Sequence, residues 1–219
     1  MTKTPAPMDK LDVSGIPGTN GPEGDLVDWQ SIDWRTVEED VRRLRQRIFT
    51  ASRDGDLKRV RNLQKLMLRS RSNALVAVRR VAEVNAGRKT PGVDGRTALL
   101  AGAKADLACW AQSSSRTWTP RAVKRVYIPK SDGKKRPLGI PVIRDRAMQA
   151  LVLNALEPEW EARFEPRSYG FRPGRGCHDA IEAIFRVTRG SLSKRRWVLD
   201  ADLVAAFDRI DHQRLLESL

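Results

Sequence analysis

Apolar residues recur at helical spacing in two segments of the N-terminal half, which predicts two amphipathic helices. The first helix is expected to begin near Thr36, because Thr36 and Glu39 fit a capping box. A longer helix is expected from about residue 56 to residue 86, and Gly87 is its expected stop. The apolar positions that define the two helices are Val37, Val41, Leu44, Ile48, Leu57, Val60, Leu63, Met67, Ala74, Val78 and Val81.

Basic residues fill the positions between these apolar seams. Residues 42–80 hold 13 Lys or Arg and two Asp. A single arginine on such a helix is better interpreted as part of a solvated face, but the cluster as a whole favours contact with a phosphate backbone. The candidate RNA-binding residues are Arg42, Arg43, Lys58, Arg59, Arg61, Lys65 and Arg69.

Residues 87–97 form a Gly/Pro-rich loop, and a short helix is expected between Thr97 and Gln112. The sequence after this helix is typical of extended strands. Runs 123–129 and 136–142 flank Ser-Asp-Gly, and Asp-Gly favours a tight turn, so a β-hairpin is predicted. Its prolines indicate an edge or a twisted ribbon. Its many lysines and arginines suit closure over a polyphosphate.

The C-terminal part alternates helical and turn-rich sequence. We expect a helix over 145–156 that Pro158 interrupts, and another over 177–188 that Gly190 ends. A strand is expected at 195–203, with Asp202 near its end.

The composition and net charge of the chain indicate the class of molecule that it binds. The 219 residues carry a formal net charge of +14, with a pI near 10.5, which points to a polyanion such as nucleic acid. The first 34 residues are acidic, so the positive charge lies in the body of the chain, and residues 1–32 are expected to be a disordered leader. Cysteine and histidine form no metal motif, and no apolar run could span a bilayer, so a cytoplasmic location is expected.

Four stretches, in this order, carry a resemblance to a known family: TPGVDG (90–95), YIPKSDGKKRPLGIPVIRDRAMQ (127–149), SYGFRPGRGCHDAI (168–181) and DADLVAAFDRIDH (200–212). Together they resemble the N-terminal half of group II intron reverse transcriptases, also called intron-encoded maturases. The resemblance covers roughly residues 33–219. Retrons and diversity-generating elements share the palm chemistry, but SYGFRPGR and the long helical extension favour the intron type.

The resemblance implies an α+β fold, namely the beginning of a right-hand polymerase. Residues 33–118 would form the N-terminal helical extension with its GVDG loop, and residues 119–195 would form the fingers. Residues 196–219 would hold the first palm motif, truncated after it. RNA, as intron and template, a DNA primer and a dNTP are the implied partners.

The first palm motif implies magnesium chemistry at Asp202. In the family this motif supplies one aspartate and one backbone carbonyl to two Mg²⁺ ions, and these positions match Asp202 and Leu203. The other carboxylates come from a Tyr/Phe-Ala-Asp-Asp motif, which does not occur in the 219 residues. The chain by itself is therefore expected to be catalytically inactive.

Nucleotide binding is implied for a second set of positions. Phe207 matches the aromatic residue that stands where a ribose 2′-hydroxyl would lie, and Lys130 and Arg136 match the basic residues that hold the triphosphate. The backbone N–H groups of Ala205 and Ala206 could line the same triphosphate. The family often has Lys-Gly-Cys where this chain has Val-Ala-Ala, and the small residues still allow close approach of a nucleotide.

Three functions are compatible with these residues. The first is the N-terminal part of an RNA-directed DNA polymerase that copies RNA into DNA and assists intron splicing and mobility. An alternative is a non-catalytic basic RNA-binding module. The third is a fragment that complements a separately encoded C-terminal polymerase half.

Overall fold

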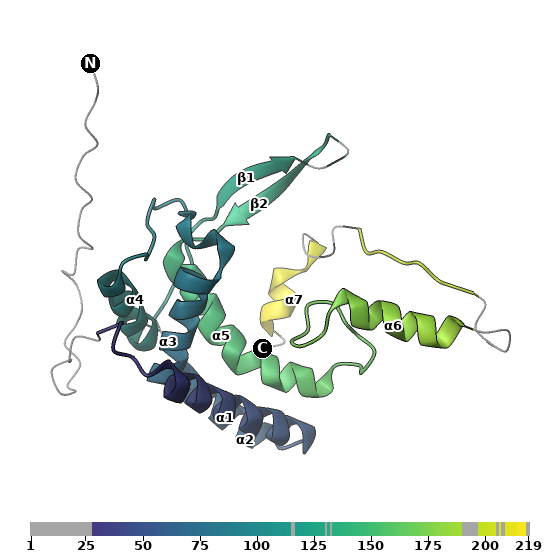
Figure 1. The fold of residues 1–219 in the computed structure, drawn as a ribbon, viewed down its shortest axis with the longest axis horizontal. Helices are drawn as coiled ribbons and strands as arrows, with labels where there is room; N and C mark the ends of the chain where they lie inside the picture. The colour runs from purple at the N-terminus through teal and green to yellow at the C-terminus, as the bar shows by residue number, and fades with distance from the viewer. Residues whose placement is uncertain are drawn as a thin grey trace. The chain divides into compact units, whose positions relative to one another are not determined.

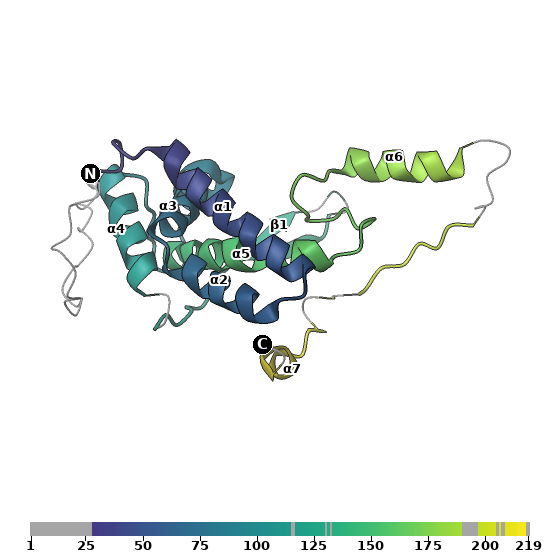
Figure 2. The same ribbon diagram turned by 90° about the horizontal axis from the view of Figure 1, so that it is seen from below.

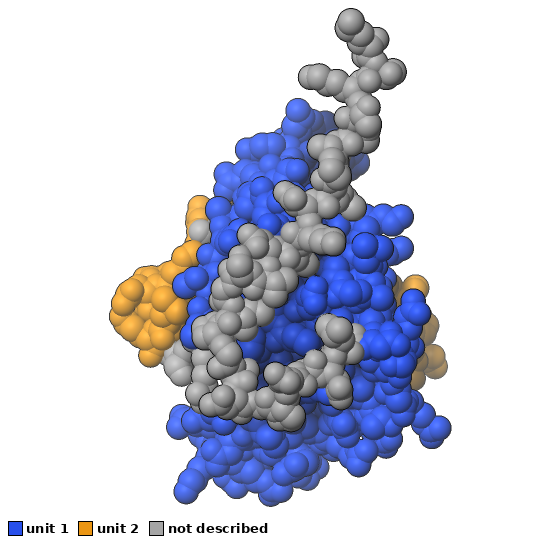
Figure 3. All heavy atoms as spheres, turned by 90° about the vertical axis from the view of Figure 1, so that its left-hand side faces the viewer, with its two compact units in different colours: residues 1–164 blue, residues 165–219 orange. Residues whose placement is uncertain are grey.

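The computed structural model describes residues 28–114, 117–129, 131, 133–189, 197–204, 206 and 209–217. The chain divides into two compact units, residues 1–164 and residues 165–219 (Figure 3). Unit 1 combines helices with a two-stranded antiparallel sheet, which fits the predicted α+β class.

Helix α1 (Trp34–Arg53) begins two residues before the expected start. Its N-cap is Asp33, whose Oδ1 accepts the backbone N–H groups of Arg35 and Thr36 over 3.1 and 3.3 Å. The hydroxyl of Thr36 donates to Asp33 Oδ2 over 2.6 Å, so Thr36 supports the cap and is not itself the cap. The capping box expected at Thr36 is therefore wrong, because the aspartate three residues earlier satisfies the free N–H groups first.

Gly55 makes the turn into helix α2 (Leu57–Arg69) with a φ of +75°, a value that glycine adopts without steric cost. The expected single helix over 56–86 is wrong, because the chain breaks at Ser70. Ser70 is extended, with a ψ of 127°, and its hydroxyl accepts the N–H of Asn73 to cap helix α3 (Arg71–Arg79).

The helical path after α3 continues for one turn as a π-helix, η1 (Arg80–Val84). It ends at Asn85, which is extended, and a 3₁₀ turn, η2 (Ala86–Lys89), follows. The helix thus ends before Gly87, the residue expected to stop it. The ending at Asn85 leaves Glu83 on the π-turn, where its carboxylate accepts hydrogen bonds from Trp29 and Lys104.

Helix α5 (Ile143–Arg163) contains Pro158 and is not interrupted by it, contrary to expectation. A proline inside a helix leaves the carbonyl four residues earlier without its N–H donor. That carbonyl belongs to Asn154, and it accepts a hydrogen bond from Arg45 Nη1 of α1 over 3.5 Å. Arg45 also pairs with Glu157, so α1 supplies the contacts that keep α5 continuous.

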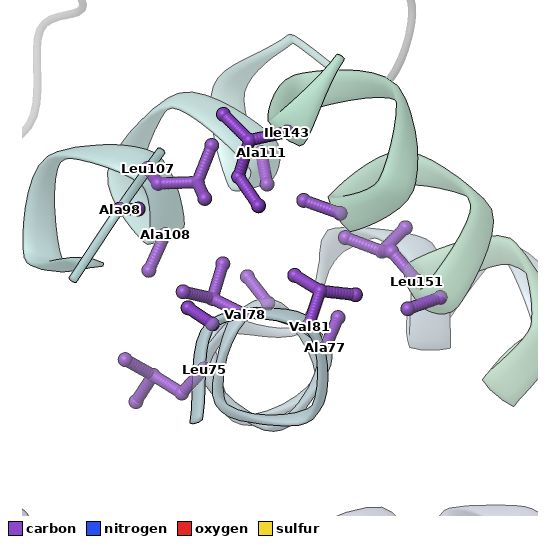
Figure 4. Close-up of a cluster of buried hydrophobic side chains, with 14 of the residues drawn as sticks. Leu75, Ala77, Val78, Val81, Ala98, Leu107, Ala108, Ala111, Ile143 and Leu151 are labelled. Atoms are coloured by element: carbon purple, nitrogen blue, oxygen red, sulfur yellow. The ribbon is translucent and has the colours of Figure 1, made fainter. Parts of the chain in front are cut away.

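The core of unit 1 lies where α3, helix α4 (Ala101–Ser113) and α5 meet (Figure 4). Alanines on all three helices allow close packing around the larger side chains of Val78 and Leu151. A second cluster joins α1 and α2 to Ala155 of α5. Figures 1 and 2 show α1 and α2 lying side by side, with α5 next to them.

The predicted hairpin is confirmed. Strands β1 (Lys124–Pro129) and β2 (Lys135–Ile140) pair antiparallel, and Figure 1 shows them projecting from the helices of unit 1. The tip contains Gly133 with a φ of +78°. All the side chains of the two strands are exposed or half-buried.

Unit 2 contains helices α6 (Cys177–Thr188) and α7 (His212–Glu217). The strand expected at 195–203 is wrong for its described part, because 197–203 forms no strand and Trp197 is 96% exposed. A strand needs a partner for its N–H and C=O groups, and the described residues of unit 2 offer no second strand. Over the described ranges, no helix is both long and apolar enough to cross a membrane.

Candidate nucleic-acid interface

Helix α2 carries a straight row of positive charge. Lys58, Arg61, Lys65 and Arg69 are three or four residues apart and all exposed. At about 100° per residue they lie along one side of the helix. The opposite side buries Val60, Leu63 and Met67, which fixes how the helix is rotated. We refer to Lys58, Arg61, Lys65 and Arg69 as the α2 basic row.

No acidic residue interrupts this row. Helix α2 contains no Asp or Glu, and none of the four basic side chains forms an ion pair with any residue in the described part of the chain. Arg59, also expected to bind RNA, is exposed on the flank of the row. The row therefore presents uncompensated charge of the kind that attracts a phosphate backbone.

The two candidate arginines of α1 differ from the row. Arg42 lies 3.2 Å from Glu39 and Arg43 lies 3.6 Å from Asp40, each within its own helix. Both ion pairs are exposed, so each contributes little to stability. Their acidic partners nevertheless offset the positive charge that α1 presents to a polyanion.

On the hairpin, the strand pairing places Arg136 opposite Ile128, and Lys124 opposite Ile140. Residues directly opposite in an antiparallel pair share a face, and alternate residues along a strand do so as well. Lys124 and Arg136 therefore share the face that also holds Val126. Sequence reasoning missed Lys124 as a partner of Arg136, although the two-residue alternation about the Asp-Gly turn could have identified it.

Asp202 and Leu203 lie in an exposed segment of unit 2 that forms neither helix nor strand. A carboxylate oxygen and a backbone carbonyl are both ligands that magnesium prefers. Within the described ranges no group of three or more His, Cys, Asp or Glu comes together. The donor types thus suit Mg²⁺, but Asp202 contributes a single carboxylate.

Other expected nucleotide-binding residues fall partly outside the described chain. Ala206 is exposed, whereas Lys130, Ala205 and Phe207 lie outside the described residues. Asp211 accepts the N–H groups of Gln213 and Arg214 over 3.0 and 3.2 Å and so caps the start of α7.

The SYGFRPGR stretch forms a turn held by its own arginines. Arg172 is 7% exposed, and its Nη1 donates to the carbonyls of Glu165 and Ser168 over 2.6 and 3.0 Å. Arg175 also donates to the carbonyl of Ser168, over 3.3 Å. Phe171 has a φ of 59°, a conformation rare for an aromatic residue. These two arginines therefore stabilise the turn.

Two sequence families match this chain. The N-terminal domain of reverse transcriptase matches residues 29–109, and the reverse transcriptase (RNA-dependent DNA polymerase) matches residues 128–219. The first match contains α1 to α3, and the second contains most of the hairpin, α5 and Asp202.

Individual relatives agree with these matches. The chain is 41% identical to Protein YkfC of Escherichia coli (strain K12) over 149 residues, which cover 66% of this chain and 39% of the relative. It is 44% identical to the group II intron-encoded protein LtrA of Lactococcus lactis subsp. cremoris over 101 residues, 46% of this chain and 16% of the relative. Maturase-like protein 1 of Euglena gracilis is 27% identical over 192 residues, 87% of this chain and 42% of the relative.

The chain therefore belongs to the reverse transcriptase family. Within that family it is related to the group II intron-encoded proteins and maturases, as the resemblance in the motifs predicts. The matched region spans less than half the length of each of these three relatives.

Proposed function

We propose that this chain binds RNA and contributes the helical extension, the fingers and the first palm motif of an RNA-directed DNA polymerase of the group II intron type. The complete activity copies RNA into DNA, extends a DNA primer and assists intron splicing and mobility. The observation that carries the RNA-binding part is the α2 basic row, which is exposed, lies opposite the buried side of its helix and forms no ion pair with the described residues.

The row suits RNA because its charges are fixed in a line. Successive members are three or four residues apart, which is about 5 Å along a helix axis, and the helix is held by its packed side. Phosphate contacts of this kind are independent of base sequence and position a strand for other groups to act on. Arg42, Arg43 and Arg59 would add to the contact, Arg42 and Arg43 less strongly because of Glu39 and Asp40.

An equilibrium titration of a labelled single-stranded RNA tests this assignment. Glutamine at all four positions of the row is expected to weaken binding by about 100-fold near 0.1 M salt, since the row no longer neutralises any phosphate. The control replaces Arg35, Arg186, Arg189 and Arg214 with glutamine, which removes the same charge from dispersed exposed sites. Equal reductions of affinity in the two variants would show that only net charge matters and would refute the row as the binding surface.

For the polymerase part, we propose that Asp202 and the Leu203 carbonyl hold Mg²⁺, which when bound stabilises the attacking and leaving oxygens of nucleotide transfer. Lys130 and Arg136 would bind the triphosphate of the incoming dNTP, with the N–H groups of Ala205 and Ala206, while the ring of Phe207 would exclude a ribose 2′-hydroxyl. Lys124, on the same hairpin face as Arg136, would add a further positive charge.

These 219 residues contribute one carboxylate to the two-metal chemistry, so we propose that they do not polymerise DNA when assayed by themselves. Primer extension on an RNA template with Mg²⁺ and dNTPs measures this. No extension above that of an Asp202→Ala control is expected. Extension that depends on Asp202 would contradict the proposal.

Binding of a second polypeptide is a further candidate function, and the exposed apolar residues of helix α6 favour it. None of its residues is buried, and Ile181, Ile184 and Phe185 are 60%, 62% and 56% exposed. We propose that a polypeptide carrying the later palm motifs covers this apolar face and completes the enzyme. Co-expression with such a polypeptide should restore Asp202-dependent extension. A chain that binds RNA yet gains no activity in this way is a non-catalytic RNA-binding module.

A further inference from the structure

Two segments that each carry an exposed arginine pack against the first turn of α5, which carries an arginine of its own. Arg144 belongs to α5 itself, Arg96 follows the GVDG loop, and Arg121 precedes the hairpin. None of the three was a candidate site residue from the sequence.

The GVDG loop is fixed against the start of α5. A Cβ added to Gly92 would lie 2.7 Å from Val142 Cα, so the loop backbone lies directly on the residue that precedes α5. Arg146 donates from Nη1 to the carbonyl of Gly87 over 2.9 Å and from Nη2 to that of Thr90 over 2.8 Å. These contacts hold the loop, and thereby the following Arg96, near the first turn of the helix.

A buried carboxylate fixes the third segment. Asp145 is 3% exposed, and its Oδ2 accepts the backbone N–H of Arg121 over 2.9 Å. Its Oδ1 accepts the indole N–H of Trp118 over 3.0 Å. Both oxygens of Asp145 are thus engaged with N–H donors, and Arg121 is anchored to α5 through its backbone while its side chain stays exposed.

Arg144 directly precedes Asp145 and Arg146, whose side chains contact the two segments. Its guanidinium carbon is 5.0 Å from the centroid of the Trp110 ring, and the residue is half-buried. Burial lowers the pKa of Arg144, and the positive charges of Arg96 and Arg121 lower it further. Asp94 acts in the opposite direction, and its Oδ1 also accepts the N–H of Arg96 over 3.1 Å.

Positive charge exceeds negative charge at this place. The arginines are Arg96, Arg121, Arg144 and Arg146, against the carboxylates of Asp94 and Asp145. Over the described residues, Arg96, Arg121 and Arg144 form no ion pair. Gathered like charges repel one another, and a bound anion removes that repulsion.

We propose that Arg96, Arg121 and Arg144 form a phosphate-binding site for the backbone of an RNA strand. Guanidinium groups match the phosphate geometry with two parallel hydrogen bonds, which lysine cannot supply. The ring of Trp110 limits the rotation of Arg144, and the fixed loop and the Asp145 anchor position the other two. The inference rests on the proposed RNA binding and names a second contact surface for it, separate from the α2 basic row.

The test uses the full chain and a fluorescein-labelled single-stranded RNA 12-mer, with anisotropy measured from 0.1 to 0.3 M NaCl. We expect the variant Arg96→Gln/Arg121→Gln/Arg144→Gln to bind about ten-fold more weakly at 0.1 M. The slope of log K against log salt should become shallower by about 0.7 for each phosphate that the variant no longer neutralises. The matched control, Arg186→Gln/Arg189→Gln/Arg214→Gln, should change affinity less than two-fold.

Two further variants separate binding from folding. Arg96→Gln/Arg121→Gln changes only exposed side chains, so its circular dichroism should match the unaltered chain while its RNA affinity still falls. Arg144→Lys keeps the charge and removes the two-pronged hydrogen bonding, so its affinity should lie between those of the unaltered chain and the triple variant.

Failure of this inference is distinct from failure of the proposed function. One outcome is that the variant of the α2 basic row does not bind RNA, whereas Arg96→Gln/Arg121→Gln/Arg144→Gln binds as tightly as the matched control. That outcome refutes the phosphate site and leaves RNA binding by the row in place. Should the unaltered chain bind no RNA, the proposed function fails, and the phosphate site fails with it.

Discussion

Asn154 of α5 donates a hydrogen bond from Nδ2 to Oδ1 of Asn73 of α3 over 2.8 Å, inside the core of unit 1. Asn73 is fully buried and donates its own Nδ2 to the carbonyls of Met67 and Leu151 over 3.0 and 3.1 Å. The Met67 carbonyl lies in the last turn of α2 and also accepts the backbone N–H of Ser70 over 3.1 Å. One side chain thus joins α2, α3 and α5 at the break after the α2 basic row.

Replacing Asn73 with alanine is expected to destabilise the chain by about 3 kcal/mol, because the buried amide of Asn154 would lose its acceptor and the carbonyls of Met67 and Leu151 would each lose one hydrogen bond. Urea unfolding followed by circular dichroism measures the change. Asn62→Ala, at an exposed position on α2, is the matched control and should cost less than about 0.5 kcal/mol. A destabilisation at Asn73 no larger than that of the control would show that the buried amide pair contributes nothing.

Replacement by alanine should change the stability of the chain in opposite directions at two glycines. Gly92→Ala would place Cβ 2.7 Å from the Val142 backbone, so it is expected to destabilise by about 2 kcal/mol as the loop shifts. Gly102→Ala lies within α4 with nothing within 4 Å and should stabilise by about 0.5–1 kcal/mol. Thermal unfolding of both variants decides this. A Gly92→Ala chain as stable as the unaltered protein would mean that the loop does not lie on α5 as described.

Glu83 links the π-turn to its surroundings and makes stability depend on pH. Burial raises the pKa of Glu83, but hydrogen bonds from Lys104 and Trp29 and the charges of Lys104 and Arg79 outweigh it, so the pKa lies below its usual 4.5. A lowered carboxyl pKa stabilises the folded chain above pH 4.5, and this stabilisation disappears as the pH falls through the folded-state pKa.

Glu83→Gln should therefore cost about 1.5 kcal/mol at pH 7, and the difference from the unaltered chain should shrink below about pH 4. Urea unfolding at about pH 7, 5 and 3.5 gives the comparison. Glu39→Gln on exposed α1 is the control, expected to show a small difference at neutral pH. A Glu83→Gln deficit that stays constant with pH would rule out a charge-dependent role.

Local signals in the sequence predicted several elements correctly. The hairpin follows from the Asp-Gly turn between extended runs, and α1 and the beginning of α2 follow from the three-and-four spacing of their buried residues. The basic row was visible as composition, but the absence of ion-pair partners for its four side chains among the described residues required the structure.

The elements that were mispredicted depend on contacts between distant residues. Pro158 stays within α5 because Arg45, which precedes Asn154 by 109 positions, donates to the free carbonyl of Asn154, and no local rule contains that contact. The helix breaks at Ser70, which caps α3. In the sequence this serine cannot be distinguished from a serine inside a helix. The segments that carry Arg96 and Arg121 are fixed to the helix of Arg144 by the packing of the GVDG loop and by Asp145, contacts that no local pattern contains.

The salt dependence of RNA binding tests the central claim, RNA recognition by the α2 basic row, most directly. For single-stranded RNA the slope of log K against log salt is about −0.7 for each phosphate neutralised. Removing the four charges of the row should make the slope shallower by about 3, while Asp202→Ala should leave it unchanged. A slope that does not respond to Lys58, Arg61, Lys65 and Arg69, or that changes equally with Asp202→Ala, would contradict the account.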